Sequence, residues 1–489
     1  MKRAQITVFM SLLLPLLLAV LGAVLESAYQ QALRSRVQRS LMLCEYSMLS
    51  EYQTDLWRQY GLFYLDTAYG GREESKEKLQ ARLLTYLSGN LSWKNGETRG
   101  AFTPFQTAVC DLQAEEFSRA TDHEGMGFYE QAVAFEQDLW GVGALSQWME
   151  HTKDLEILDQ QQEEYTKSEE REQRNLEVLR QRRREQEEED TPNPTEGLLG
   201  ERESSLLAMV VKNPEKLPVK AVSLQNVPSR RTLLEGRGPE GRFPGGLVND
   251  QWFHTYLLER LTDARGLLQG EKEAEGWLGC QLEYILMGKE SDRENLEGVV
   301  RRLLLLREGA NYAYLMTDQG KQAEAYALAA LVAGITLMPE LIEALQQVIL
   351  LAWAYGESVL DVRGLLQGSQ IVLFKTGETW RLPLSQLFTL RSHLEAYDGK
   401  SDEGGLSYEG YLRMFLTMLD RGTKCMRALD VIEGNVRTSD TGRNLYMDQC
   451  IDAMTIKAKF QGRSLFSGLT MVRKDGYMLS GERRFSYEW

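Results

Sequence analysis

Residues 6–25, ITVFMSLLLPLLLAVLGAVL, form an uninterrupted apolar run behind the basic residues Lys2 and Arg3. At a helical rise of about 1.5 Å per residue, a run of this length spans about 30 Å, which matches the hydrocarbon core of a bilayer. A secretory signal peptide has a shorter apolar core and small residues at its cleavage positions, and this run has neither. We therefore predict a single-pass signal anchor over residues 6–25, with residues 1–5 in the cytoplasm and the body of the protein outside it.

Three residues in or directly after the apolar run, Pro15, Gly22 and Glu26, are candidates for subunit contact. A proline in mid-span kinks a helix, and packed neighbours can satisfy the carbonyl that it frees. Glu26 lies at the outer boundary, where a carboxylate reaches water at little cost, so the alternative is a solvated helix end. The segment LLLPLLLAVLGAVLES resembles the N-terminal anchor of the TadE and TadG pseudopilin-like proteins of tight-adherence pilus systems. This resemblance implies a membrane-anchored subunit.

The composition of the whole chain argues against several classes of function. A net charge of −15 opposes nucleic-acid binding, which needs clustered Lys and Arg. The five cysteines lie far apart without zinc-type spacing, so no metal site is predicted, and which thiols pair stays open. The four histidines are scattered, and no Walker loop, zincin or nucleophile-elbow motif occurs. We therefore expect no catalytic residues, no cofactor and no enzymatic activity.

The predicted fold class is α+β, with a helix-rich body that contains short strands and hairpins. The anchor continues into a helix from Ser27 to about Tyr60, whose apolar residues recur at steps of three or four: Leu33, Val37, Leu41, Cys44, Met48, Tyr52 and Leu56. This stripe either is buried on the core of the body or packs against other anchored subunits. Gly61 should end the helix. A short strand in LFYLD, a helix over 74–88, strands over 105–118 and a helix from 127 complete a region over 26–150.

Residues 151–245 are predicted to be a charged helix followed by an insertion or linker. The helix ends in RQRRREQEEED, which is typical of a solvated face that projects from the body. Seven of the eleven prolines lie between residues 191 and 246. This stretch also contains Gly236-Arg-Gly238-Pro-Glu-Gly241, the spacing of a dinucleotide fingerprint. Pro239 removes a backbone donor and no strand precedes the motif, so we interpret these glycines as a loop.

The region over 246–489 is the more ordered half of the sequence. Ser291 with Glu294 predicts a capped helix, and two apolar helices over 321–338 and 340–363 are too short and too closely flanked by charge to cross a membrane. They are interpreted as core helices, with a re-entrant hairpin as the alternative. IVLF and TWRL predict a β-hairpin. Two amphipathic helices follow, and strands around a turn at Lys474-Asp475-Gly476 close the chain.

Six segments carry a second resemblance, which runs over nearly the whole chain except about residues 151–245. They are SEYQTDLWRQYGLFYLDTAYG, ATDHEGMGFYEQAV, EYILMGKESDRENL, LREGANYAYL, LLAWAYGESVLDVRGLL and LSYEGYLRMFLTMLDR. These segments resemble an uncharacterised family of single-span membrane proteins of clostridia and related Gram-positive bacteria that accompany tight-adherence or type IV pilus-like assembly genes. The resemblance implies a membrane-anchored extracytoplasmic component and supplies no catalytic residue.

Charged residues inside the apolar helices mark the place where a hidden site would lie. Arg307, Glu357, Asp361 and Arg363 are candidates for a buried ion-pair network, because buried carboxylates and guanidiniums must pair. Such networks are structural more often than functional. Paired carboxylates are also the residues of glycoside hydrolysis, but helical spacing does not place them across a cleft.

Three classes of function follow from the sequence. The first is a non-enzymatic pseudopilin-like or accessory subunit of a tight-adherence or type IV pilus-like assembly. Its partners are the bilayer, through residues 6–25, and other membrane-anchored subunits. The second is a membrane-tethered surface scaffold or adhesion module unrelated to pili, and the third is a cell-wall enzyme with an unrecognised site. Subunit packing through the stripe over 33–56 would require that face of the helix to be exposed.

Overall fold

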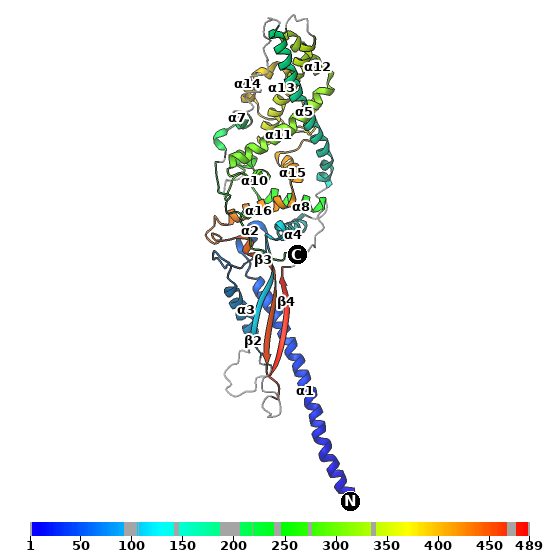
Figure 1. Cartoon of the computed structure of the whole chain (residues 1–489), viewed down its shortest axis with the longest axis vertical. Helices are drawn as coiled ribbons and strands as arrows, with labels where there is room; N and C mark the ends of the chain where they lie inside the picture. The colour runs from blue at the N-terminus through cyan, green and yellow to red at the C-terminus, as the bar shows by residue number, and fades with distance from the viewer. Residues whose placement is uncertain are drawn as a thin grey trace. The chain divides into compact units, whose positions relative to one another are not determined.

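The computed structural model describes residues 2–91, 105, 107–140, 146–185, 206–217, 219–238, 246–271, 276–333, 339–466 and 476–487. The chain forms two units (Figure 1). Unit 1 contains residues Met1–Gln131, Thr232–Arg242 and Ser439–Trp489, and unit 2 contains Ala132–Arg231 and Phe243–Thr438. This division differs from the predicted regions over 26–150, 151–245 and 246–489, because the two ends of the chain meet in unit 1.

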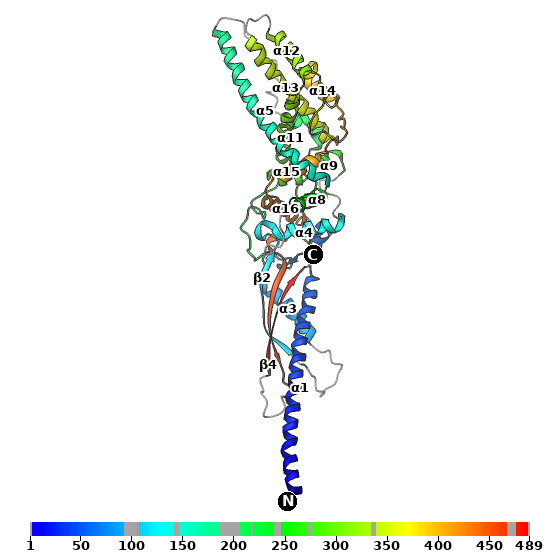
Figure 2. The same cartoon turned by 90° about the vertical axis from the view of Figure 1, so that its right-hand side faces the viewer.

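Unit 1 is built on one long helix, α1 (Lys2–Leu49). In its first half the apolar side chains from Val8 to Leu25 are exposed, apart from the half-buried Leu13. In its second half the predicted stripe is buried, with Leu33, Val37, Leu41, Cys44 and Met48 at most 2% exposed. Figure 2 shows the first half of α1 continuing beyond the part of the helix that lies beside the strands. The same helix therefore has two different environments along its length.

An antiparallel sheet covers the second half of α1. Its central strand is β3 (Cys450–Gly462), which pairs with β2 (Thr107–Arg119) along one edge. Along its other edge β3 pairs first with β1 (Leu65–Asp66) and then with β4 (Tyr477–Ser486). The predicted closing strands are confirmed as β3 and β4, although residues 474–475 of the predicted turn lie outside the described residues.

The core of unit 1 lies between this sheet and two helices, α1 and α3 (Lys76–Leu91). Alternate residues of β3 face the helices, among them Ile456, Ala458 and Phe460, and leucines at every fourth position of α3 meet them. Such alternation is expected for a sheet with one buried face. The other face is polar, with ion pairs from Lys457 to Glu115 and from Lys459 to Asp111.

The predicted helix to Tyr60 is wrong in one respect, because α1 ends at Leu49 and a separate helix α2 (Thr54–Tyr60) follows. Between them the backbone N–H of Gln53 donates to the carbonyl of Tyr64, and the Gln53 side chain caps α2 at the N–H of Asp55. Gly61 ends α2 with φ +67°, as predicted.

Gly236 and Gly238 of the Gly-x-Gly motif lie in a loop of unit 1, as predicted. Asp122 accepts a 2.8 Å hydrogen bond from the N–H of Gly236, and the N–H of Arg237 donates to the carbonyl of Phe117. A Cβ at Gly236 would lie 2.4 Å from that carbonyl oxygen. These glycines therefore permit a close backbone approach, and the N–H groups of Gly236 and Arg237 are bonded within unit 1. Residues 239–241 lie outside the described residues.

Helix α4 (Asp122–Trp140) begins at Asp122, which binds this loop. Its residues up to Gln131 belong to unit 1, and those from Ala132 belong to unit 2. Its residues His123, Glu124 and Gly125 all have positive φ. A three-residue 3-10 helix, η4 (Met447–Gln449), leads into β3.

Unit 2 is helical, and its core surrounds α13 (Pro339–Leu366), of which every residue from Val348 to Leu366 is buried. The interpretation of this helix as a core helix is confirmed. Its neighbours in the unit are α5 (Ser146–Glu185), α7 (Leu206–Val210), η2 (Pro214–Lys216), α8 (Leu247–Arg260), α9 (Ala264–Gln269), α10 (Gln281–Met287), α11 (Asp292–Thr317), α12 (Gln319–Ala333), η3 (Leu384–Thr389), α14 (Leu390–Ala396), α15 (Tyr408–Met418) and α16 (Arg421–Val436). Ser291 caps α11 at the N–H of Glu294, as predicted.

Helix α5 packs against α11 and α13 and buries Leu158, Tyr165, Leu176 and Leu179, whereas residues 186–190 of the predicted solvated tail RQRRREQEEED lie outside the described residues. One prediction for this unit needs correction. The predicted hairpin of IVLF and TWRL is absent from the described residues: Ile371 instead pairs with Leu406 in an isolated bridge.

Candidate functional site

The first half of α1 is the most distinctive surface of the chain. Among the described residues, α1 is the one helix long and apolar enough to cross a membrane, and its most apolar window has no buried residue. Pro15 lies inside the helix. A Cβ built on Gly22 meets no described atom within 4 Å, so this glycine leaves an open notch on the helix surface. Pro15 is exposed among the described residues, so both positions are open to lipid or to another helix.

Glu26, the third anchor candidate, is held by its own chain. Its Oε1 atom accepts a 2.6 Å hydrogen bond from the hydroxyl of Tyr477, a 3.0 Å bond from Ser464 and a 3.3 Å bond from the N–H of Leu465. These donors come from the start of β4 and from the residues that follow β3. The interpretation of Glu26 as a solvated helix end is therefore wrong, because the carboxylate joins the end of the apolar run of α1 to β4 and to the residues after β3.

Two further residues of α1 bind chain segments near this junction. The ring of Tyr29 stacks on Phe105 with centroids 4.9 Å apart, and its hydroxyl accepts from the Phe105 N–H. Arg36 donates to the carbonyls of Leu91 and Phe105 at 2.6 and 3.0 Å. Over about three turns, α1 thus contacts the ends of α3, β3 and β4 and the segment that precedes β2. Such contacts fix the direction of the first half of α1 relative to the sheet of unit 1.

The buried stripe also limits how α1 can contact other subunits. Because Leu33, Val37 and Leu41 pack on the sheet, they are not available to a neighbouring protein. Subunit packing through α1 is left to residues 7–25 and to the opposite face, where Met42, Leu43 and Tyr46 are exposed.

The second group of candidates lies in unit 2, where the structure brings Arg307, Glu357 and Asp361 together with Lys375. The ammonium group of Lys375 lies 2.7 Å from Oδ1 of Asp361 and 2.8 Å from Oε1 of Glu357. Arg307 contacts the other oxygen of Asp361 at 3.0 Å. All four side chains are fully buried. Two cations and two carboxylates balance, which is the condition for burying them together.

Backbone groups complete this charge cluster. Glu357 accepts hydrogen bonds from the N–H groups of Arg381 and Leu382, and Arg307 donates to the carbonyls of Val372 and Leu373. The cluster therefore joins α11 and α13 to the irregular segment over 371–382. Burial raises the pKa of Glu357. Burial opposes ionisation of Asp361 as well, but Lys375 and Arg307 beside it lower the pKa of that carboxyl. The arrangement is that of a structural ion-pair network.

Arg363, the fourth residue predicted for this network, lies elsewhere. Its guanidinium donates a 2.9 Å hydrogen bond to the carbonyl of Met209, at the end of α7. Lys375 was not among the residues predicted for this network. Lysine is almost never fully buried unless it is paired, so its place directly after the apolar run IVLF gave no local signal of burial.

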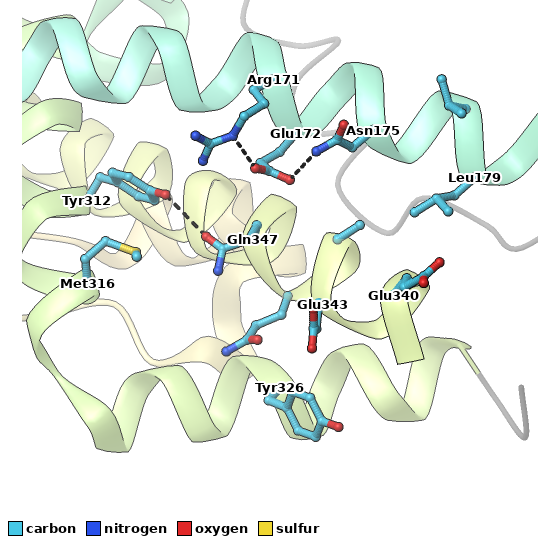
Figure 3. A pocket seen from close by; sticks show the side chains of 13 residues that line it. Arg171, Glu172, Asn175, Leu179, Tyr312, Met316, Tyr326, Glu340, Glu343 and Gln347 are labelled. Carbon is cyan, nitrogen blue, oxygen red and sulfur yellow. Dashed lines mark hydrogen bonds and ion pairs between the residues drawn. The ribbon is translucent and has the colours of Figure 1, made fainter. Parts of the chain in front are cut away.

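An open groove in unit 2, the α5–α13 groove, has no counterpart in the sequence analysis. It has a volume of about 730 Å³ and is lined by α5, α11, α12 and α13 (Figure 3). Arg171, Glu172 and Asn175 lie on the α5 side, and Glu340 and Glu343 lie on the first turns of α13. The volume is within the range of small-ligand sites. These residues are far apart in the sequence, so no spacing pattern signals the groove.

Within the groove, polar contacts are unevenly distributed. Glu172 accepts from Nε of Arg171 at 2.7 Å and from Asn175 at 3.1 Å, and the hydroxyl of Tyr312 donates to Gln347. Glu340 and Glu343 make no ion pair or side-chain hydrogen bond with any residue that the structure describes. The groove thus presents two carboxylates whose charge is not compensated by a side chain.

Comparison with known proteins gives one match. No curated protein matches the chain, and no solved structure matches it either. A model for a family of unknown function, DUF5702, matches residues 184–462, which include the charge cluster and β3 but not α1 or β4. The matched range takes in residues 184–245, part of the stretch that the sequence analysis left outside its resemblance. Because this range exceeds half of the sequence, the chain belongs to the DUF5702 family.

Proposed function

We propose that this protein is a non-enzymatic, single-pass membrane component of a tight-adherence or type IV pilus-like assembly, with a cytoplasmic N-terminus and an extracytoplasmic body. It acts as a pseudopilin-like or accessory subunit. The observation that supports this proposal is that one continuous helix, α1, supplies both the apolar segment and the core of the sheet. A contact made by residues 7–25 with another subunit is thereby transmitted to unit 1 without a flexible joint.

The junction residues give this proposal its mechanical basis. Glu26, Tyr29 and Arg36 each bind a segment of unit 1 within the first turns after the apolar run. A simple lipid anchor does not require such a rigid connection, because a flexible linker would tether the body equally well. A subunit that must be oriented in an assembly does require it. The resemblance of the anchor to those of TadE and TadG points to the same class of assembly.

The second candidate function, a surface scaffold or adhesion module unrelated to pili, is favoured by the α5–α13 groove. An open polar groove on a tethered body is a site at which such a module would hold its partner. The two candidates differ in which part of the chain contacts other proteins.

Site-specific photocrosslinking in cells that assemble the pilus-like machinery tests the proposal. A photoreactive amino acid replaces Leu17, which is 57% exposed on α1, and in a second strain replaces Leu331, which is 78% exposed on α12. The expected result is that Leu17 crosslinks to a pilin-like or membrane-platform subunit of that machinery, identified by mass spectrometry, and that Leu331 does not. Lipid adducts alone at Leu17 would contradict the proposal.

A further inference from the structure

The α5–α13 groove combines two features that together specify the chemistry of an occupant. One is its excess of negative charge. The guanidinium of Arg171 is engaged by Glu172, whereas Glu340 and Glu343 have no cationic partner among the described side chains. The N-terminus of α13 adds about half a positive charge, which offsets only part of this excess. The described residues that line the groove therefore carry a formal charge of −2, from one arginine and three glutamates.

The other feature is an aromatic and apolar wall. Tyr326 projects from α12 and is 47% exposed, although it is a large side chain next to the groove. Met316 and Val178, on α11 and α5, are exposed to a similar extent at 44% and 49%. An aromatic face attracts an ammonium or guanidinium group within about 6 Å. Apolar side chains beside carboxylates suit a group that has an alkyl stem and a cationic head.

We propose that the α5–α13 groove is a binding site for a basic peptide segment of a partner protein, whose Lys or Arg side chains pair with Glu340 and Glu343. The stem of the inserted side chain packs on Tyr326 and Met316, and the amides of Asn175 and Gln347 lie within the same groove to bind the peptide backbone. A volume of about 730 Å³ is larger than one side chain needs, so a segment of several residues is accommodated. This inference does not rest on the proposed function, because it concerns unit 2 and not the anchor.

The test is a fluorescence-anisotropy titration of the full-length protein in nonionic detergent. The probe is the labelled peptide Gly-Lys-Gly-Lys-Gly, and its uncharged counterpart is Gly-Gln-Gly-Gln-Gly. The variant is Glu340→Gln with Glu343→Gln. The matched control is Glu215→Gln with Glu403→Gln, which removes the same charge from exposed positions of unit 2 that lie outside the groove.

The expected result is saturable binding of the lysine peptide by the wild type. The groove variant should bind this peptide with about fivefold to tenfold lower affinity, which is the effect expected from the loss of two exposed ion pairs. The control variant should bind like the wild type, and the glutamine peptide should not bind. Tyr326→Ala should weaken binding further without changing its dependence on charge. An equal loss in both double variants, or tighter binding of the free polyamine spermidine than of the peptide, would overturn the proposal.

Discussion

The hydroxyl of Tyr477 donates a 2.6 Å hydrogen bond to Oε1 of Glu26, so the first residue after the apolar run of α1 is joined to the start of β4. The two residues are 451 positions apart in the sequence. Two further donors, Ser464 and the N–H of Leu465, converge on the same oxygen. This convergence adds to the contacts of Tyr29 and Arg36 in fixing the direction of the apolar half of α1.

The first prediction concerns this junction. Glu26→Gln keeps the accepting oxygen and should retain the contacts, whereas Glu26→Ala removes all three. Hydrogen bonds to a carboxylate contribute about 1.5–3 kcal/mol, so the alanine variant should expose the Leu465 amide to solvent much more often. Hydrogen exchange at Leu465, measured by mass spectrometry, checks this. Equal protection of Leu465 in Glu26→Ala and the wild type would show that the junction does not depend on Glu26.

A second prediction follows from the close crossing of α5 and α11 at Gly309. A Cβ at this position would lie 2.6 Å from the backbone nitrogen of Gln162 and 2.7 Å from its Cα atom. Because the obstacle is backbone, Gly309→Ala must separate the helices and should cost about 1–3 kcal/mol of stability. Gly364→Ala in α13 is the matched control, since its nearest neighbours lie 3.5–3.6 Å away. Thermal unfolding of both variants measures the difference, and equal melting temperatures would refute the predicted crossing.

The sequence predicted the parts of this fold that local patterns decide. The apolar run, the stripe from Leu33 to Met48 and the cap at Ser291 all follow from residue spacing or from side-chain chemistry within one turn. The end of α1 at Leu49 does not. It depends on a hydrogen bond from the backbone N–H of Gln53 to the carbonyl of Tyr64. No proline or glycine in the sequence signals this tertiary contact.

The absent hairpin has a comparable cause. IVLF and TWRL have the composition of strands, but their backbone groups bond to buried side chains and not to each other. Glu357 accepts hydrogen bonds from the N–H groups of Arg381 and Leu382, and Arg307 donates to the carbonyls of Val372 and Leu373. Two charged residues on α11 and α13 thus replace strand pairing. Both residues were predicted as members of a buried ion-pair network, but their backbone partners were not predicted.

The third prediction concerns Lys375 at the centre of this cluster. Lys375→Met would leave Glu357 and Asp361 buried with one fewer cation, and breaking a buried pair in this way costs about 3–5 kcal/mol. Lys375→Met combined with Glu357→Gln removes one charge of each sign and should recover part of that loss. Lys167→Met is the control, because its pair with Glu163 is exposed and is expected to contribute little to stability. Urea unfolding of the three variants tests the order.

A fourth prediction is a pH dependence of stability set by Glu283. Burial, followed by the nearby charge of Asp263, raises the pKa of Glu283 from 4.5 to about 7. The folded protein therefore binds this proton more tightly than the unfolded chain, and its stability should fall as the pH rises from about 4.5 to 7. The difference amounts to about 3 kcal/mol above pH 7.

Glu283→Gln should remove this slope. The amide oxygen of glutamine can still accept from the Ala264 N–H and the Tyr408 hydroxyl, so the fold of this region is retained. Urea unfolding across this pH range should show the variant gaining stability relative to the wild type as the pH increases. The exposed substitution Glu403→Gln serves as the control. A constant difference between the two proteins at all pH values would mean that Glu283 does not titrate in this range.

The last prediction uses a native cysteine to test the topology. All five cysteines are free thiols, and Cys110 on β2 is the exposed one, whereas Cys44, Cys280, Cys425 and Cys450 are buried. Burial raises the pKa of Cys44 and of Cys425 to about 12, which further suppresses their thiolate forms at neutral pH. A membrane-impermeant maleimide added to protoplasts should therefore label one thiol per chain if the body lies outside the cytoplasm. Cys110→Ser should abolish this labelling, and denaturation should reveal the remaining four thiols. Labelling of the wild type only after the membrane is permeabilised would place unit 1 in the cytoplasm. This result would contradict the proposal that α1 orients an extracytoplasmic subunit.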